Sequence, residues 1–350
     1  MKKFYAMILC TMLTLMMLLS AVSSLAEGTE EEKKDYFNPD YQWEFVWNTK
    51  GISKLKSKAA TQQGTVETLT YTTPAYAVNA IMGTDYVIEK SVNIYLPYGY
   101  DPEKSYNVLY LMHGGGDDQD YWLTDKSDRT HGKTTMRVLD HMIEDGLCEP
   151  LIVVTPTFYA EVTDVEIDNE RMQAVIDEIG ESHYNSLSGL YTWYFGDEFR
   201  NNIIPAVESV YPTYANGDVS EANLIATRDH RAYCGLSMGS LTSFHGVLMR
   251  NFDILSWCGS WSGSMTDEPL FRETIEKNYL DYDMKFWYNG NGVEDQAFQE
   301  HYDIYNTLME TMSGKFVDGQ NSVMVVFSDG GHNYAAWIAD LYNCLLVFFK

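Results

Sequence analysis

The residues best suited to chemistry lie at positions 235–239, with the sequence Gly-Leu-Ser-Met-Gly. An apolar run at 232–236 leads into them, and a segment compatible with a helix follows at 241–249. Gly-x-Ser-x-Gly between a strand and a helix is the sequence form of a nucleophile elbow, a tight turn that exposes the serine hydroxyl. The two glycines leave room where side chains would collide in such a strained turn. The pattern predicts Ser237 as a nucleophile, with an ordinary strand-to-helix turn as the alternative.

A serine hydroxyl attacks well only when a base takes its proton and a third group orients that base. In a fold with a nucleophile elbow, the acid and then the histidine follow the serine along the chain, each after a later strand. Of the eight histidines, only His301 and His332 lie well beyond the elbow and its helix. His332 ends the sequence Ser-Asp-Gly-Gly-His directly after the last apolar run, whereas His301 falls inside a predicted helix. We therefore predict His332 as the base.

The acid should lie in the loop after the preceding strand. Residues 289–295, Asn-Gly-Asn-Gly-Val-Glu-Asp, form that loop, and Asp295 is the predicted acid, with Glu294 as the close alternative. Asp329 is nearer to His332 in sequence, but residues three apart in a turn seldom reach the required side-chain geometry. Asp295 completes a predicted group of alcohol, imidazole and carboxylate.

A negative charge that develops on a carbonyl oxygen needs backbone donors beside the serine. The N–H of Met238 directly follows the nucleophile and is one predicted donor. Residues 113–116, His-Gly-Gly-Gly, follow an apolar run at 108–112, and their glycines allow the backbone to approach a substrate closely. Gly115 is the predicted second donor and Gly116 the next candidate.

The elements that must position these residues follow from the hydrophobic pattern. Residues 65–72 and 86–96 alternate apolar and polar residues, as half-buried antiparallel strands do. Continuous apolar runs, typical of parallel strands buried on both faces, occur at 108–112, 151–154, 232–236, 285–288 and 323–327. Helix-like segments occur at 134–144, 197–210, 241–249, 296–312 and 334–348. This order predicts an α/β fold, a doubly wound, mostly parallel sheet with antiparallel N-terminal strands and helices on both faces.

The sequence predicts that the chain is divided into three parts. Residues 1–26 have the basic start, apolar core and small-residue end of a secretory signal peptide, which predicts a secreted protein with no membrane association after cleavage. Residues 27–63 form a polar and then aromatic extension, whose aromatic side chains are expected to pack on the main domain. Residues 64–350 form that domain. Within it, 156–194 is predicted as a long loop, either shaping the substrate site or a plain insertion.

The formal net charge of −26 falls to −28 if Lys2 and Lys3 are removed with the signal peptide. Such a surface disfavours nucleic acid or anionic lipid as a partner and favours a neutral ligand such as a carbohydrate. The cysteines at 148, 234, 258 and 344 are widely spaced and form no Cys-x-x-Cys pair, which argues against a zinc site. Neither a metal nor an organic cofactor is predicted. The sequence leaves cysteine pairing and oligomeric state open.

Four segments together resemble the esterase D-like α/β-hydrolases, the branch that contains carbohydrate esterase family 1 (CE1). They are Asn-Ile-Tyr-Leu-Pro-Tyr-Gly-Tyr-Asp at 93–101, Leu-Tyr-Leu-Met-His-Gly-Gly-Gly at 109–116, His-Arg-Ala at 230–232 leading into the elbow, and Gly-His at 331–332. The resemblance covers about residues 64–350 and implies an α/β-hydrolase fold. It also implies the same assignment of Ser237, Asp295, His332, Met238 and Gly115, with the acid as the loosest match.

For a secreted member, the resemblance implies an esterase that removes feruloyl or acetyl groups from xylan-type polysaccharide, or acts on a small aryl or acetyl ester. Feruloyl esterases and acetyl-xylan esterases are the members concerned. Among the aromatic residues, Trp193 and Trp261 are the predicted stacking faces for a ring or a sugar. The alternatives are an acyltransferase or general carboxylesterase on the same scaffold, and a carbohydrate-binding protein with a vestigial site.

Overall fold

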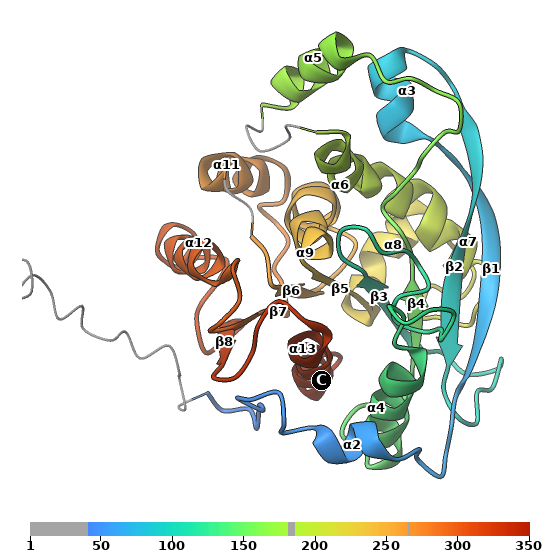
Figure 1. Ribbon diagram of the computed structural model, residues 1–350, viewed down its shortest axis with the longest axis vertical. Helices are drawn as coiled ribbons and strands as arrows, with labels where there is room; N and C mark the ends of the chain where they lie inside the picture. The colour runs from blue at the N-terminus through green and yellow to red at the C-terminus, as the bar shows by residue number, and fades with distance from the viewer. Residues whose placement is uncertain (1–40, 181–185, 265–266) are drawn as a thin grey trace, which may run out of the picture. The chain divides into compact units, whose positions relative to one another are not determined.

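The computed structural model describes residues 41–180, 186–264 and 267–350. Within them the strands form a single eight-stranded sheet in the order β1-β2-β4-β3-β5-β6-β7-β8 (Figure 1). β1 pairs antiparallel with β2 and β2 antiparallel with β4, and all the other pairs are parallel. The strands are β1 Thr65–Pro74, β2 Val87–Leu96, β3 Asn107–Met112, β4 Leu151–Thr155, β5 Arg231–Leu236, β6 Trp257–Trp261, β7 Phe286–Gly292 and β8 Ser322–Phe327.

Burial differs between the parallel strands and the N-terminal hairpin. Every residue of β3 to β8 is buried, as a sheet covered on both faces requires, whereas most of β1 and the first half of β2 remain exposed or half-buried. The predicted doubly wound, mostly parallel sheet with antiparallel N-terminal strands is confirmed. One parallel strand, β6, is missing from the predicted runs because it carries Gly and Ser between its two tryptophans.

Helices cover both faces of the sheet, and alternate residues of β3 show the two cores. Val108 and Tyr110 belong to the core beneath α6, α9 and α11, whereas Leu109 and Leu111 belong to the core beneath α4 and α13 (Figure 1). The described helices are α2 Ser53–Ser57, α3 Tyr76–Met82, α4 Gly132–Glu144, α5 Asn169–Ile179, α6 Leu187–Glu198, α7 Ile204–Glu208, α8 Glu221–Ala226, α9 Met238–Thr242, α10 Met249–Asn251, α11 Glu268–Asn278, α12 Phe298–Thr311 and α13 Tyr334–Val347. Two π-helical segments, Phe199–Ile203 and Ser243–Leu248, continue α6 and α9, and Arg228–His230 is a 3₁₀ turn.

The aromatic residues that precede β1 pack on the main sheet. Trp43 meets Phe286 edge to face with ring centroids 4.8 Å apart, and Phe45 meets Tyr288 in the same way at 5.7 Å. Asp40–Lys350 is accordingly one compact unit, so the described part of the predicted extension belongs to the same body as the sheet. The predicted signal peptide, residues 1–26, lies outside the described residues.

The predicted long loop at 156–194 contains two helical stretches, which corrects that prediction. It contains α5 and the first part of α6, and α6 begins about ten residues before the helix expected at 197–210. The first turns of α6 carry apolar residues on several sides, among them Leu190, Tyr191 and Phe195, all buried. A helix buried on most sides shows little amphipathic period, so the pattern gave no signal for it.

No helix among the described residues is long and apolar enough to cross a membrane. The four described cysteines, Cys148, Cys234, Cys258 and Cys344, are all free and buried.

Candidate active site

Ser237 occupies a strained turn between β5 and α9. Its backbone has φ 52° and ψ −118°, which is rare for a residue with a side chain. A Cβ on Gly235 would lie 2.2 Å from the carbonyl oxygen of Gly239, and one on Gly239 would lie 2.4 Å from that of His113. The two glycines of the motif are therefore required by close backbone approach. The Ser237 N–H donates to the carbonyl of Trp261 at 2.8 Å, which ties the turn to the neighbouring strand.

The structure brings Ser237, His332 and Asp295 together at the carboxyl ends of β5, β8 and β7. The Nε2 atom of His332 lies 3.1 Å from the Ser237 Oγ, and its Nδ1 lies 3.0 and 3.2 Å from the two carboxylate oxygens of Asp295. A carboxylate only accepts hydrogen bonds, so Nδ1 carries the proton and Nε2 is free to accept one from the serine. The His332 side chain is 28% exposed and that of Asp295 fully buried.

Asp295 is held as an anion by its surroundings. Burial alone would raise its pKa, but hydrogen bonds to the carboxylate, that from His332 first, outweigh burial and bring the pKa below its ordinary value. The backbone N–H of Ala297 donates to one carboxylate oxygen at 2.8 Å, and the Ser262 side chain also lowers the pKa of Asp295. Ser262 follows β6 and has a positive φ of 55°. Sequence reasoning missed it, because nothing in the pattern separates it from other serines.

The alternative residues lie elsewhere. Glu294 is exposed, and its neighbour Asp295 takes the inward position. Asp329 accepts hydrogen bonds from the N–H and the hydroxyl of Thr49, at 2.7 and 3.1 Å. His301 is buried on α12 and contacts the side chains of two β7 residues, Asn289 and Asn291; burial lowers its pKa to about 3.

The loop 113–116 lies directly against the elbow. A Cβ on Gly114 would lie 3.3 Å from the Ser237 Cβ, and one on Gly115 would lie 2.9 Å from the Met238 sulfur. In the described parts of the chain, no acceptor takes the N–H of Gly115 or that of Met238. The Gly116 N–H instead donates to the Tyr159 hydroxyl at 3.0 Å. The two predicted donors thus adjoin one another beside Ser237 with their N–H groups available.

His113 fixes this loop to the sheet. It is fully buried, its Nδ1–H donates to the Gly114 carbonyl at 2.7 Å, and its Nε2 accepts from the Thr157 hydroxyl at 2.8 Å. Burial lowers the pKa of His113 to about 3, so the ring is neutral and keeps this one donor and one acceptor.

A cavity of about 430 Å³ opens beside the Ser237 hydroxyl and the His332 ring. Its walls come from the start of α6, from α9 and the segment after it, from the loop after β6 and from the start of α12. The lining residues are Ser186, Ser188, Gly189, Thr192, Ser237, Met238, Leu241, His245, Ser262, Gly263, Ser264, Gln296, Ala297, Glu300 and His332.

The two predicted stacking tryptophans do not line this cavity. Trp261 is fully buried in β6 and packs edge to face against Trp122, so it has no free ring face and the prediction for it is wrong. Trp193 is half-buried on α6, where its ring lies beneath the guanidinium of Arg250 at 4.9 Å. An aromatic residue in an apolar run does not reveal whether it faces a ligand or the core.

Within the described residues, no group of three or more His, Cys, Asp or Glu side chains could hold a metal ion.

Comparison with known proteins shows what this chain is similar to. A family model described as "Putative esterase" matches residues 88–348. A solved serine-to-alanine mutant of the feruloyl esterase module from Clostridium thermocellum, complexed with sinapinate, is 27% identical with a TM-score of 0.64, over 90% of this chain and 96% of that one. A CE1 ferulic acid esterase from Anaeromyces mucronatus shares the fold, at 21% identity and a TM-score of 0.61 over 85% of this chain and 95% of that one.

Two curated relatives are much longer than this chain. Endo-1,4-beta-xylanase Y from Acetivibrio thermocellus is 36% identical over 208 residues, which are 59% of this chain and 14% of the relative. Endo-1,4-beta-xylanase/feruloyl esterase from Xylanibacter ruminicola is 26% identical over 179 residues, 50% of this chain and 19% of the relative. The matched part of this chain spans less than a fifth of the length of either relative.

Proposed function

The chain belongs to the esterase family, as a serine carboxylic-ester hydrolase of the CE1 type, and we propose that it removes feruloyl or acetyl groups from xylan-type polysaccharide through an acyl-enzyme intermediate. The observation that carries the proposal is the hydrogen-bonded line from the Ser237 Oγ through His332 to Asp295. Secretion by the signal peptide at residues 1–26 is part of the same proposal, and those residues lie outside the described ones.

In the first half of the reaction, the Ser237 Oγ attacks the ester carbonyl carbon while the His332 Nε2 takes the hydroxyl proton. The carbonyl oxygen becomes an oxyanion and accepts from the N–H groups of Met238 and Gly115. Asp295 stabilises the imidazolium that forms, because its carboxylate accepts the Nδ1–H. The intermediate collapses when the bond from carbon to the alcohol oxygen breaks and His332 returns the proton to that oxygen. The acyl group is left on Ser237.

In the second half, water attacks the acyl-serine and gives its proton to the His332 Nε2. The same two N–H groups bind the second oxyanion. Collapse breaks the bond to the Ser237 Oγ, which takes the proton back from His332, and the free acid leaves. No atom beyond the ester, water and these residues is required.

Of the two acyl groups, the feruloyl group fits the cavity better. A volume of about 430 Å³ is within the range of pockets that hold small organic ligands and far exceeds what an acetyl group fills. The solved relative from Clostridium thermocellum carries sinapinate, an aromatic acid of similar size to ferulate. We therefore place the feruloyl ester first and the acetyl ester second.

A substrate panel on the purified protein tests this function. We expect hydrolysis of methyl ferulate to exceed that of acetylated xylan and of long-chain esters. A Ser237→Ala variant should lose turnover and labelling by a fluorophosphonate probe, whereas Ser209→Ala, at an exposed serine, should keep both. Labelling of the Ser237→Ala protein at the wild-type rate would overturn the proposed nucleophile, and preference for long-chain esters would overturn the proposed substrate.

A further inference from the structure

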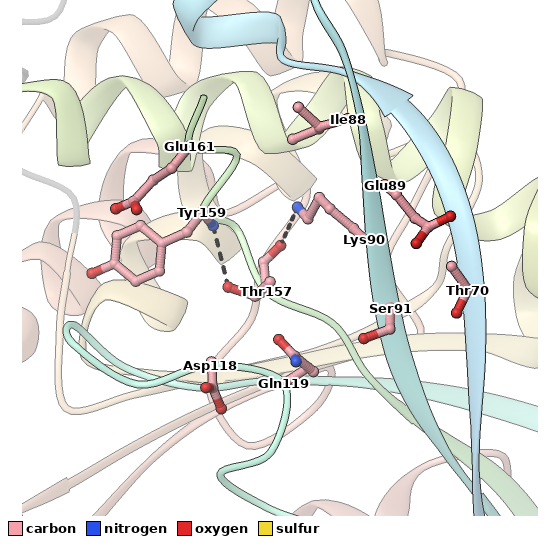
Figure 2. Close-up of a pocket in the computed structure, with 10 residues that line it drawn as sticks. All are labelled: Thr70, Ile88, Glu89, Lys90, Ser91, Asp118, Gln119, Thr157, Tyr159 and Glu161. Carbon is pink, nitrogen blue, oxygen red and sulfur yellow. Dashed lines mark hydrogen bonds between the residues drawn. The ribbon is translucent and has the colours of Figure 1, made fainter. Parts of the chain in front are cut away.

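We call the loop 113–116 the catalytic loop. A second cavity, of about 510 Å³, lies beside it, and we call this cavity the hairpin groove (Figure 2). Its residues come from the β1–β2 hairpin, from the turn after the loop 113–116 and from the segment after β4. They are Thr70, Ile88, Glu89, Lys90, Ser91, Asp118, Gln119, Thr157, Tyr159 and Glu161. Two of them, Thr157 and Tyr159, contact the loop 113–116, and none supplies a reacting group at Ser237.

The groove exists because the β1–β2 hairpin runs past the end of β4. β1 and β2 pair along their whole length, from Thr65 with Leu96 to Pro74 with Val87. β2 pairs with β4 only at 93–95, so the rest of the hairpin stands clear of the sheet and forms a wall.

This wall is fixed by a buried ion pair. The Lys90 ammonium lies 2.7 Å from the Glu198 carboxylate, with side chains only 7% and 3% exposed, and it also donates to the Thr157 carbonyl at 2.8 Å. The Tyr71 hydroxyl donates to the same carboxylate at 2.6 Å. Because Glu198 lies on α6 and Thr157 follows β4, two other parts of the fold hold the hairpin in one position. A preformed cavity costs little ordering when a ligand enters.

The hairpin groove adjoins the catalytic loop through Tyr159. Its hydroxyl accepts from the Gly116 N–H, and its ring stacks on His113 with centroids 5.9 Å apart. The carbonyl of Gln119, just after the loop, accepts from the side chains of Asn93 at 2.9 Å and Thr155 at 2.7 Å. The loop 113–116 therefore has the hairpin groove on its β4 side, and Ser237 with the 430 Å³ cavity on its β5 side.

The lining chemistry favours a neutral ligand rich in hydroxyl groups. Glu89, Asp118 and Glu161 have exposed carboxylates, and none of these is in an ion pair with another described residue. Thr70 and Ser91, which face one another across the hairpin, add hydroxyl groups. Carboxylates accept strong hydrogen bonds from hydroxyl donors, and the overall charge of −26 repels anions.

We propose that the hairpin groove binds a sugar residue of the polysaccharide whose ester reacts at Ser237. This inference rests on the proposed function, because it assigns the saccharide part of that substrate to a site apart from the acyl cavity. The groove then contributes to recognition of a polymeric ester and is left empty by a small one.

The test compares a feruloylated xylan oligosaccharide with methyl ferulate, which has no sugar. For Glu89→Gln and Glu161→Gln we expect kcat/KM on the oligosaccharide to fall about tenfold, the effect of one charge-assisted hydrogen bond, with methyl ferulate changed by less than about twofold. Thr70→Trp, at an exposed position, fills the groove and should cause the same selective loss. Glu103→Gln is the matched control. Glu103 is exposed and lies before the amino end of β3, whereas the catalytic loop follows the carboxyl end of that strand. Equal effects on both substrates, or no effect on either, would overturn the proposal.

Calorimetry separates the groove from the proposed reaction. A xylan oligosaccharide without ferulate is titrated into Ser237→Ala protein and into the same protein carrying Thr70→Trp. Binding that the tryptophan abolishes supports the groove even if no ester proves to be a substrate. Hydrolysis of methyl ferulate with no oligosaccharide binding leaves the proposed function standing and refutes the groove. Calcium binding that Glu89→Gln removes, in the absence of sugar binding, likewise refutes it and assigns the carboxylates to a cation.

Discussion

Replacing Asp295 by asparagine tests the member of the proposed catalytic group for which the sequence offered an adjacent alternative, Glu294. The substitution keeps size and shape and removes the negative charge that faces the His332 Nδ1. If the new amide nitrogen faced Nδ1, the imidazole would be forced into the wrong tautomer, with its proton on Nε2 and no capacity to accept from Ser237. In the comparable arrangement of serine proteases, this change costs about 10⁴-fold in kcat.

The structure sets the lower limit of the effect. The Ala297 N–H donates to the Asp295 Oδ1, so the asparagine carbonyl is expected at that position and can still accept from Nδ1, 3.0 Å away. In that orientation the tautomer survives, and only the charge that stabilises the imidazolium is lost. We therefore expect kcat to fall by about 10³- to 10⁴-fold, or about 4 to 5.5 kcal/mol of transition-state stabilisation.

The assay is steady-state hydrolysis of methyl ferulate by purified Asp295→Asn protein, with thermal unfolding to show that the fold is kept. Glu294→Gln is the matched control, because it makes the same chemical change one residue away at an exposed side chain. The control should stay within about twofold of the unaltered protein, since exposed substitutions away from special contacts have small effects. A fall of less than tenfold in the Asp295→Asn variant, or an equal fall in both variants, would refute the assignment of the acid.

Three further outcomes follow from the contacts. Tyr159→Phe removes the acceptor that anchors the catalytic loop, and kcat on methyl ferulate should fall about tenfold with KM little changed; an unchanged kcat would contradict this. Glu208→Gln leaves Arg231 buried without its bidentate partner, so urea denaturation should show a loss of about 3–5 kcal/mol, and a loss under 1 kcal/mol would contradict it. His113 and His301 have folded pKa values of about 3, below those of the unfolded chain, so the unfolded state binds more protons as pH falls below about 6.5. Stability should then decrease by up to about 2.7 kcal/mol per pH unit between pH 6 and 4, and His301→Asn should roughly halve that slope.

The parts of the site that sequence could predict are those where local backbone geometry dictates the residue. The turn at Ser237 demands two glycines, and the loop at 113–116 needs small residues to approach the elbow. Both motifs directly follow continuous apolar runs, and His332 lies in the short loop after β8. Since parallel strands end at one edge of the sheet, strand order alone predicts that these segments meet.

The sequence alone does not decide between Glu294 and Asp295 as the acid. Topological order indicates the loop after β7, but which of two adjacent acids turns inward depends on the loop conformation. The N–H of Glu294 donates to the Gly330 carbonyl at 2.9 Å and that of Asp295 to the Gly292 carbonyl at 3.0 Å, contacts that no pattern in the sequence encodes. The prediction that Trp261 stacks on a ligand is wrong for a related reason. Burial of a whole strand is set by the helices packed on both of its faces.

The segment before β1 supports the loop that carries His332, a contact that the sequence did not predict. Ser328, at the start of the loop that carries His332, donates its N–H to the Trp47 carbonyl at 3.2 Å, and Asp329 is held by Thr49. Two hydrogen bonds between the Val46 backbone and the Asn343 side chain extend the contact to α13. These partners lie about 280 to 300 residues apart along the chain, beyond the reach of any local pattern. The loop with the proposed base is therefore braced from outside the β/α framework. This brace explains how a turn with two consecutive glycines holds an imidazole 3.1 Å from the serine.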